Sequence, residues 1–89
     1  MKIKADYIMR EVAGMTVIVR VSGTAGAFNG TMKCNDTAKL LFTHLQQGAT
    51  RDALVQALRE EYPDVEESRL AADTDAFLAT LRSYDMLEE

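Results

Sequence analysis

The two residue types best suited to catalysis or metal binding, histidine and cysteine, each occur once in this chain. His44 lies among leucines in a segment of helical periodicity and has no second histidine or neighbouring cysteine to act with it as a metal site or catalytic pair. Cys34 precedes a predicted helix N-terminus, where the helix dipole favours the thiolate, but strand alternation turns its side chain inward as a small buried hydrophobe. We therefore predict no metal site, no cofactor and no catalytic residue.

The glycines and the paired acids do not indicate an active site either. The glycine-rich stretch at 22–30 has no following Gly-Lys-Ser/Thr and leads into a predicted strand, so it lacks the geometry of a phosphate loop. The acid pairs at 60–61 and 66–67 flank Pro63 on a predicted surface turn, where a two-carboxylate mechanism has no cleft. We expect a protein without enzymatic activity.

Length and composition indicate one ordinary globular domain spanning residues 1–89, with 47% hydrophobic and 27% charged residues. The sequence shows no signal peptide and no apolar run that could cross a membrane, and one cysteine excludes an internal disulfide, so we expect a cytoplasmic protein. Residues 1–49 contain six Lys/Arg against three acids, whereas residues 50–89 contain four Arg against eleven acids. The C-terminal half would repel a polyanion such as DNA.

Three short segments rich in β-branched residues or with alternating polarity predict strands. They are Tyr7–Val12, Thr16–Val21 and Thr31–Cys34, separated by a turn at 13–15 and a wing or hairpin loop at 22–30. Gly14 can take the positive φ that a tight turn requires. In the third strand Met32 and Cys34 are expected to point inward, and Thr31 and Lys33 outward.

Three helices follow directly. Asn35 and Thr50 are predicted N-caps of the first two, Gly48 ends the first, Pro63 ends the second, and residues 64–67 resemble a capping box at the start of the third. The apolar side of the third helix is expected to carry Leu70, Phe77, Leu78, Leu81 and Tyr84. The order β-β-β-α-α-α predicts an α+β fold, a three-stranded antiparallel sheet packed on three helices, similar to a winged helix-turn-helix.

Such a fold suggests DNA binding, but the predicted third helix carries two Arg against four acids between residues 66 and 82, which removes most of the affinity for phosphate. The third strand offers another function. As the last strand of the sheet it has an unpaired edge, which a foreign peptide could extend by strand addition. Lys33 could instead guard this edge against association, or the edge could pair with a second copy of the chain.

The segments FNGTMKCNDTAKLLF and LQQGATRDALVQALREEYPDVEESRLAADTDAFLATLRSYDML resemble the PqqD-like family, the coenzyme PQQ synthesis protein D group. The matching positions are Gly30, Asn35, Asp36, Thr37, Ala38, Phe42, Leu45, Gly48, Thr50, Leu54, Leu58, Tyr62, Val65, Asp73, Phe77, Leu81 and Leu87. The resemblance extends from about Gly14 to the last residue. Cys34 stands where the family usually has Leu, and Asp85 where it commonly has Gly.

This resemblance implies a non-catalytic domain that binds the leader of a ribosomally made precursor peptide and presents it to a modifying enzyme such as a radical-SAM maturase, in PQQ synthesis or another peptide pathway. The leader would lie as an added strand against the third strand and third helix. The implied peptide-binding residues are Thr31, Met32, Lys33, Cys34, Leu70, Asp73, Thr74 and Phe77. The alternatives are a winged-helix DNA-binding regulator and a structural dimerisation module, with the protein either a monomer or a homodimer.

Overall fold

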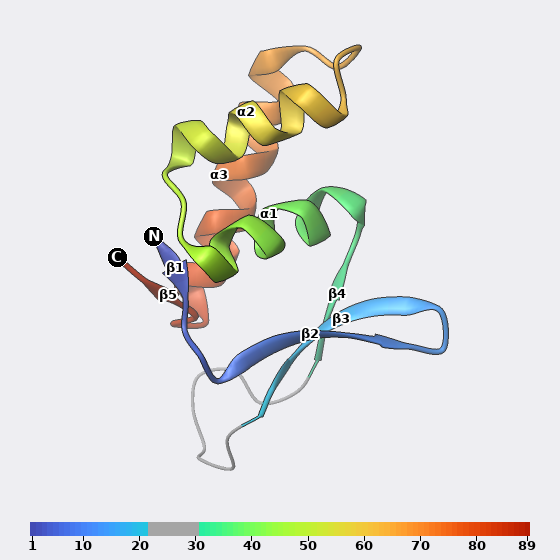
Figure 1. The fold of residues 1–89 in the computed structure, drawn as a ribbon, viewed down its shortest axis with the longest axis vertical. Coiled ribbons are helices and arrows are strands. Elements are labelled where there is room, and N and C mark those ends of the chain that lie inside the picture. Colours follow the sequence, from blue (N-terminus) through green and yellow to red (C-terminus); the bar gives the residue numbers. More distant parts are fainter. Residues whose placement is uncertain (22–30) are drawn as a thin grey trace.

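A computed structural model describes residues 1–21 and 31–89, so the loop predicted at 22–30 lies outside the described residues. In chain order the elements are β1 (Lys2–Ile3), β2 (Tyr7–Val12), β3 (Met15–Arg20), β4 (Thr31–Cys34), α1 (Asp36–Gln47), α2 (Arg51–Glu61), α3 (Glu67–Ser83) and β5 (Leu87–Glu88) (Figure 1). The expected α+β order, three antiparallel strands followed by three helices, is confirmed by β2-β3-β4 and α1-α2-α3. This arrangement is compatible with the winged-helix-like fold that the sequence suggested.

A two-residue turn sets the register of the β2–β3 hairpin. Ala13 and Gly14 have φ values of 53° and 81°, the positive values that a tight hairpin turn requires at both central positions. Val12 and Met15 therefore pair directly. Met15 is thus the first residue of β3, whereas the sequence had predicted it to be part of the turn. The hairpin runs beneath α1 in Figure 1, and Glu11, close to its turn, forms an ion pair with Lys39 of α1 at 3.5 Å.

One face of the sheet supplies its share of the core. The register places Met9, Ile18 and Met32 in a row across the three strands, and Ile18 is fully buried. Met32 and Cys34 pack against the core, which confirms that both side chains point inward. Directly paired residues share a face of an antiparallel sheet, so Lys33 lies on the opposite face, beside Val17.

The first two helices begin at the residues predicted to cap them. The side-chain oxygen of Asn35 accepts a hydrogen bond from the N–H of Ala38 at 2.8 Å, and that of Thr50 accepts one from the N–H of Ala53 at 3.1 Å. Gly48, with a φ of 96°, ends α1 as expected. These caps satisfy N–H groups that the first turn of a helix leaves without an internal partner.

The start of α3 differs from the expectation. Asp64 does not cap this helix; the N-cap is Glu66, and no side chain caps it. After α2 ends at Glu61, ahead of Pro63 as predicted, the N–H of Val65 donates to the carbonyl of Tyr62 at 3.1 Å. This turn takes up the residues that the capping-box interpretation had assigned to the first turn of α3.

The two ends of the described chain form a second, two-stranded sheet that the sequence had not indicated. Ile3 of β1 pairs with Leu87 of β5, and both side chains are buried. The chain reverses after α3 at Asp85, whose φ is 57°, a left-handed conformation that glycine adopts without strain. Tyr84 follows the end of α3 and is 38% exposed, so its predicted place on the apolar side of the helix is wrong.

The core lies between the helices and the inner face of the sheet. Its buried members are Ile3, Tyr7, Ile18, Leu41, Phe42, Leu45, Leu54, Leu58, Leu70, Leu78, Leu81, Met86 and Leu87. Leu70, Leu78 and Leu81 confirm three of the predicted apolar positions of α3, and Phe77 packs against the same core while partly exposed. None of the helices in the described residues is long and apolar enough to cross a membrane.

Candidate functional site

Strand β4 forms one edge of the three-stranded sheet. In the part of the chain that the structure describes, β4 pairs with β3 alone. The direction of its backbone groups follows from a hydrogen bond at the other side of the sheet, where the N–H of Val21 donates to the carbonyl of Asp6 at 2.8 Å. Hydrogen-bonded and non-hydrogen-bonded pairs alternate along an antiparallel ladder, so Val19 and Val17 also bond to β2.

The remaining β3 residues, among them Ile18 and Thr16, must therefore turn their backbone groups toward β4. Their partners there are Met32 and Cys34, whose N–H and C=O groups close the ladder with β3. Lys33 and Thr31 occupy the intervening positions, so each directs one donor and one acceptor to the open side. These two residues give β4 the backbone pattern that an added strand requires.

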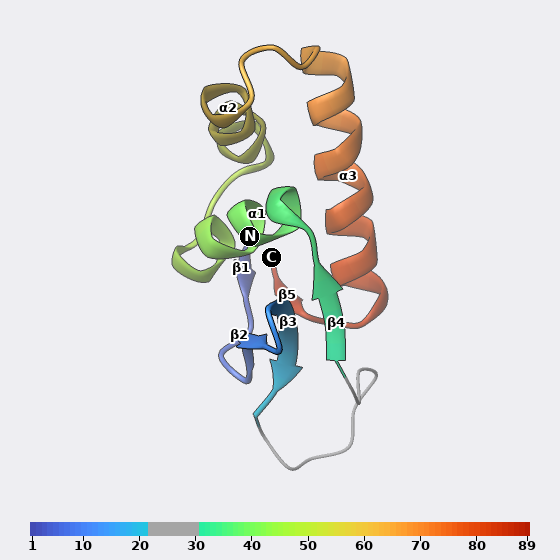
Figure 2. The same cartoon turned by 90° about the vertical axis from the view of Figure 1, so that its right-hand side faces the viewer.

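A groove of about 720 Å³ runs beside this edge, between β4, α1 and α3. Figure 2 shows β4 running alongside the C-terminal part of α3, with the start of α1 above it. The lining residues are Met32, Lys33 and Asn35 at the end of the sheet, Thr37, Ala38 and Leu41 from α1, and Arg69, Asp73, Ala76, Phe77 and Thr80 from α3. An extended chain along β4 would lie in this groove.

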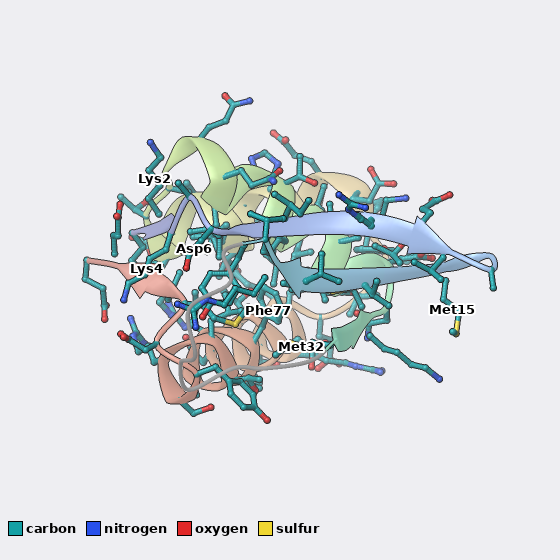
Figure 3. The ribbon with its side chains drawn as sticks, turned by 90° about the horizontal axis from the view of Figure 1, so that it is seen from below. Lys2, Lys4, Asp6, Met15, Met32 and Phe77 are labelled. Carbon is teal, nitrogen blue, oxygen red and sulfur yellow. The ribbon has the colours of Figure 1, made fainter. Side chains whose placement is uncertain are left out.

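The groove combines apolar side chains with charged ones. Met32 and Phe77 approach it from the sheet and from α3 (Figure 3), and Leu41, which is fully buried, supplies part of its floor. Lys33, Arg69 and Asp73 are exposed at its margins. The apolar side chains can cover an apolar side chain of a ligand, and the charged ones can select its neighbours.

The residues predicted for the site divide into three groups. Met32, Lys33, Asp73 and Phe77 line the groove together. Leu70 and Thr74 are buried, with 3% and 0% exposure, and the hydroxyl of Thr74 donates to the carbonyl of Leu70 at 2.8 Å, so these two side chains belong to the core. Thr31 and Cys34 flank the lining residues on β4.

Sequence reasoning missed several lining residues, among them Arg69, Ala76 and Thr80 of α3 and Thr37 and Ala38 of α1. The α3 residues follow the same helical spacing as Asp73 and Phe77, at intervals of three and four, so they form one row on the helix surface. That row was visible in the sequence as a polar and small-residue stripe beside the leucines, but nothing in its composition marked it as a groove.

The cysteine and the histidine play no part in the groove. The Sγ atom of Cys34 lies 3.9 Å from the carbonyl of Met32, and burial raises the pKa of the Cys34 thiol above its ordinary value. The thiol form is therefore favoured, in keeping with the inward orientation predicted for this side chain. His44 is exposed on α1. Among the described residues, no group of three or more His, Cys, Asp or Glu could hold a metal ion.

Comparison with known proteins adds two findings. The family model described as coenzyme PQQ synthesis protein D (PqqD) matches residues 15–87. The chain is also similar to the solved structure of TbiB1 in complex with the TbiA(beta) leader peptide, with a TM-score of 0.74 and 21% sequence identity over 99% of this chain and 95% of that one. At this identity the likeness shows a common fold. No curated protein matches the sequence significantly.

Proposed function

The chain belongs to the PqqD family, and from this premise we propose that it binds the leader segment of a ribosomally made precursor peptide by adding it as a strand to β4. It then presents the bound precursor to a modifying enzyme, such as a radical-SAM maturase, without catalysing a reaction itself. The pathway is PQQ synthesis or the maturation of another peptide-derived product.

One observation carries this proposal: the open edge of β4 borders the groove. Thr31 and Lys33 direct their backbone donors and acceptors to the side where the groove lies. An extended peptide there would continue the ladder, and ladder hydrogen bonds give affinity that depends little on the peptide's sequence. A single exposed edge without a neighbouring groove would favour association between copies instead.

The groove supplies the selectivity that the ladder lacks. Alternate side chains of an added strand point to one face, so every second residue of the leader would face α1 and α3. An apolar residue among them would cover Met32 and Phe77, above the buried Leu41 of the groove floor. The fold shared with TbiB1, which was solved with a leader peptide bound, supports this use of the scaffold.

The core supports a role for residues 1–89 as one recognition domain. Ile3 of β1 and Leu87 of β5 belong to the same buried cluster as Leu41 of the groove floor. The terminal sheet is thus connected through the core to the groove.

We expect leader affinities in the nanomolar to micromolar range, about −12 to −8 kcal/mol.

The test is a titration of isotope-labelled protein with the leader of a precursor encoded beside its gene, followed by amide NMR. The amides of residues 31–34 and of the α3 row are expected to shift, and those of Thr31 and Lys33 to gain protection from exchange. The matched control is the same leader with proline at alternate positions, which removes donors from the added strand. Binding that leaves residues 31–34 unperturbed would refute strand addition at β4.

A second measurement addresses presentation. The protein is added to the modifying enzyme and its precursor, with a leaderless core peptide as the control. It should increase kcat/KM for the full precursor and leave the leaderless peptide unaffected, since leader binding raises the local concentration of the substrate. Modification of the precursor by the protein alone would contradict the non-catalytic role.

A further inference from the structure

The positive charges of this acidic chain are unevenly matched with carboxylates. Six of the ten Lys and Arg side chains form ion pairs, namely Lys4, Arg20, Lys39, Arg51, Arg59 and Arg82. All ten lie in the described residues, and the other four, Lys2, Arg10, Lys33 and Arg69, have no ion pair there. Two of these four, Lys33 and Arg69, line the groove.

The path of a peptide along β4, which runs through the groove and past Lys33 on the other face of the sheet, therefore has a positive excess in a protein whose net charge is −4. Asp73 is the one acid among the lining residues, against Lys33 and Arg69. Asp73 lies four residues after Arg69 on α3, and the two form no ion pair. A basic residue that precedes an acidic one by four positions stabilises a helix less than the reverse order does. Both cations remain available to a ligand.

We propose that the peptide held in this groove carries acidic residues at two positions relative to an apolar anchor, one beside the anchor and one about four residues from it. This inference rests on the proposed function and specifies the ligand. The anchor faces Met32 and Phe77, the first acid lies opposite Lys33, and the second meets Arg69.

Strand and helix geometry give the spacing. Lys33 lies on the face of the sheet opposite to Met32, so the peptide residue next to the anchor, which points to that face, is the one that reaches Lys33. Arg69 precedes Phe77 by eight residues, which is about 12 Å along α3 at 1.5 Å per residue. An extended peptide covers that distance in about four residues at 3.3 Å each, so the second acid points to the same face as the anchor.

Asp73 disfavours an acidic residue at one position of the peptide. It lies midway between Arg69 and Phe77 on α3, so the peptide position two residues from the anchor faces a carboxylate. An acid at that position would be repelled, and a neutral or basic residue would be accepted. The expected pattern is thus specific in order and not a general preference for acidic peptides.

The test uses a set of synthetic extended peptides with a single leucine anchor. The parent has Glu next to the leucine and Glu four positions away; the second Glu is placed before the anchor in one series and after it in another, to cover both strand directions. Matched peptides replace each Glu with Gln or Lys, or move one Glu to the position two residues from the anchor. Dissociation constants are measured by fluorescence anisotropy, and the site by amide shifts of residues 31–34.

Each Glu→Gln change is expected to weaken binding by about 1.4- to 5-fold, the range for an exposed ion pair. Arg69→Glu and Lys33→Glu each remove an attraction and add a repulsion, so they should weaken the parent peptide on the order of two- to twentyfold. Arg10→Glu is the matched control, because Arg10 is also exposed and without an ion pair but lies on β2, the strand at the far edge of the sheet. A peptide with Lys in place of the second Glu should restore binding to Arg69→Glu.

Three outcomes would overturn the inference, and the third differs from the first two in what else it refutes. Equal affinities for the Glu, Gln and Lys peptides, with shifts at residues 31–34 in each case, would refute the charge pattern and leave strand addition intact. The same holds if Arg69→Glu and Arg10→Glu weaken the parent peptide equally. If no peptide of the set perturbs residues 31–34, the charge pattern and the proposed function both fail.

Discussion

Proline substitution at two adjacent residues of β4 tests the assignment of its backbone groups. By the alternation described above, the N–H of Met32 bonds to β3, whereas the N–H of Lys33 faces the open edge. Proline removes the donor at either position and restricts φ equally at both. Met32→Pro should therefore lower the stability of the fold, and Lys33→Pro should lower the affinity for an added strand.

The magnitudes can be worked from the bonds involved. Met32→Pro loses a ladder hydrogen bond, about 0.5–1.5 kcal/mol, and leaves the carbonyl of the buried Ile18 without its donor, about 1–3 kcal/mol more. Lys33→Pro breaks no bond within the sheet, so the two variants should differ by about 1.5–4.5 kcal/mol. In urea unfolding this difference corresponds to about 1–3 M between their midpoints, for an m-value of about 1.5 kcal/mol/M.

Met32→Ala and Lys33→Ala keep the backbone N–H at each position, so they measure the effect of losing the side chain alone. This effect is subtracted from that of the proline variant at the same position. For the bound leader the order reverses: Lys33→Pro should weaken binding about two- to tenfold relative to Lys33→Ala, because one ladder bond is missing. A larger loss of stability at Lys33 would show that the alternation has been assigned the wrong way round and that Met32 and Cys34 face the edge. Equal losses would contradict the assignment of one N–H to the sheet and the other to the open edge.

Three further predictions concern other parts of the molecule. Ala13→Asn should raise the free energy of unfolding by about 1 kcal/mol, measured by thermal unfolding, because Asn tolerates the positive φ at this turn far better than Ala; Gly14→Ala should lower it, although a methyl group there meets no atom within 4 Å. Cys34 should react with iodoacetamide more slowly in the folded protein than in urea, and its reaction rate should increase at a higher pH than that of a free thiol, because burial raises the pKa of its thiol. The stability that comes from keeping this thiol neutral is present below the unfolded pKa and is lost as the pH rises through the folded pKa. Arg51 donates hydrogen bonds of 2.6 and 3.0 Å to the carboxylate of Asp75 and lowers the pKa of that carboxyl. Asp75→Asn should therefore reduce stability at neutral pH and have no effect once acid has protonated the carboxyl, because a group with a lowered pKa stabilises the fold only above its unfolded pKa. An equal effect at both pH values would contradict this reasoning.

The parts of the fold that were predictable from the sequence are those determined by neighbouring residues. Asn35 and Thr50 cap their helices because capping depends on a side chain and an N–H three residues later. The inward orientation of Met32 and Cys34 follows from the two-residue period of a strand. The order of elements then follows from where these local signals begin and end.

The parts that were missed depend on residues far apart in the sequence or on competing local structure. Strands β1 and β5 have two residues each, too few to show a period, and they pair across nearly the whole chain. The capping-box interpretation of residues 64–67 failed because the Val65 N–H bonds to the Tyr62 carbonyl and delays the helix. Neither contact leaves a signature in the sequence.

The candidate site was predictable to the level of its strand but not of its helix face. Met32 and Lys33 follow from the edge position of β4, whereas α3 has two adjacent rows, one through Leu70 and Thr74 and one through Arg69 and Asp73. Thr74 is fully buried because its hydroxyl is satisfied within the helix by the Leu70 carbonyl. A polar residue at a core position therefore concealed which row faces the groove.

In the proposed complex, the alternation along β4 would also limit how a bound precursor can slip. Because Thr31 and Lys33 present their groups two residues apart, a guest chain that moved by one residue would turn every one of its side chains to the wrong face. The guest chain can therefore shift only by two residues at a time, and each such shift would move the apolar anchor away from Phe77. If the chain presents its precursor to an enzyme as proposed, a fixed length of peptide would extend from β4, and that length would determine which residues the enzyme can reach.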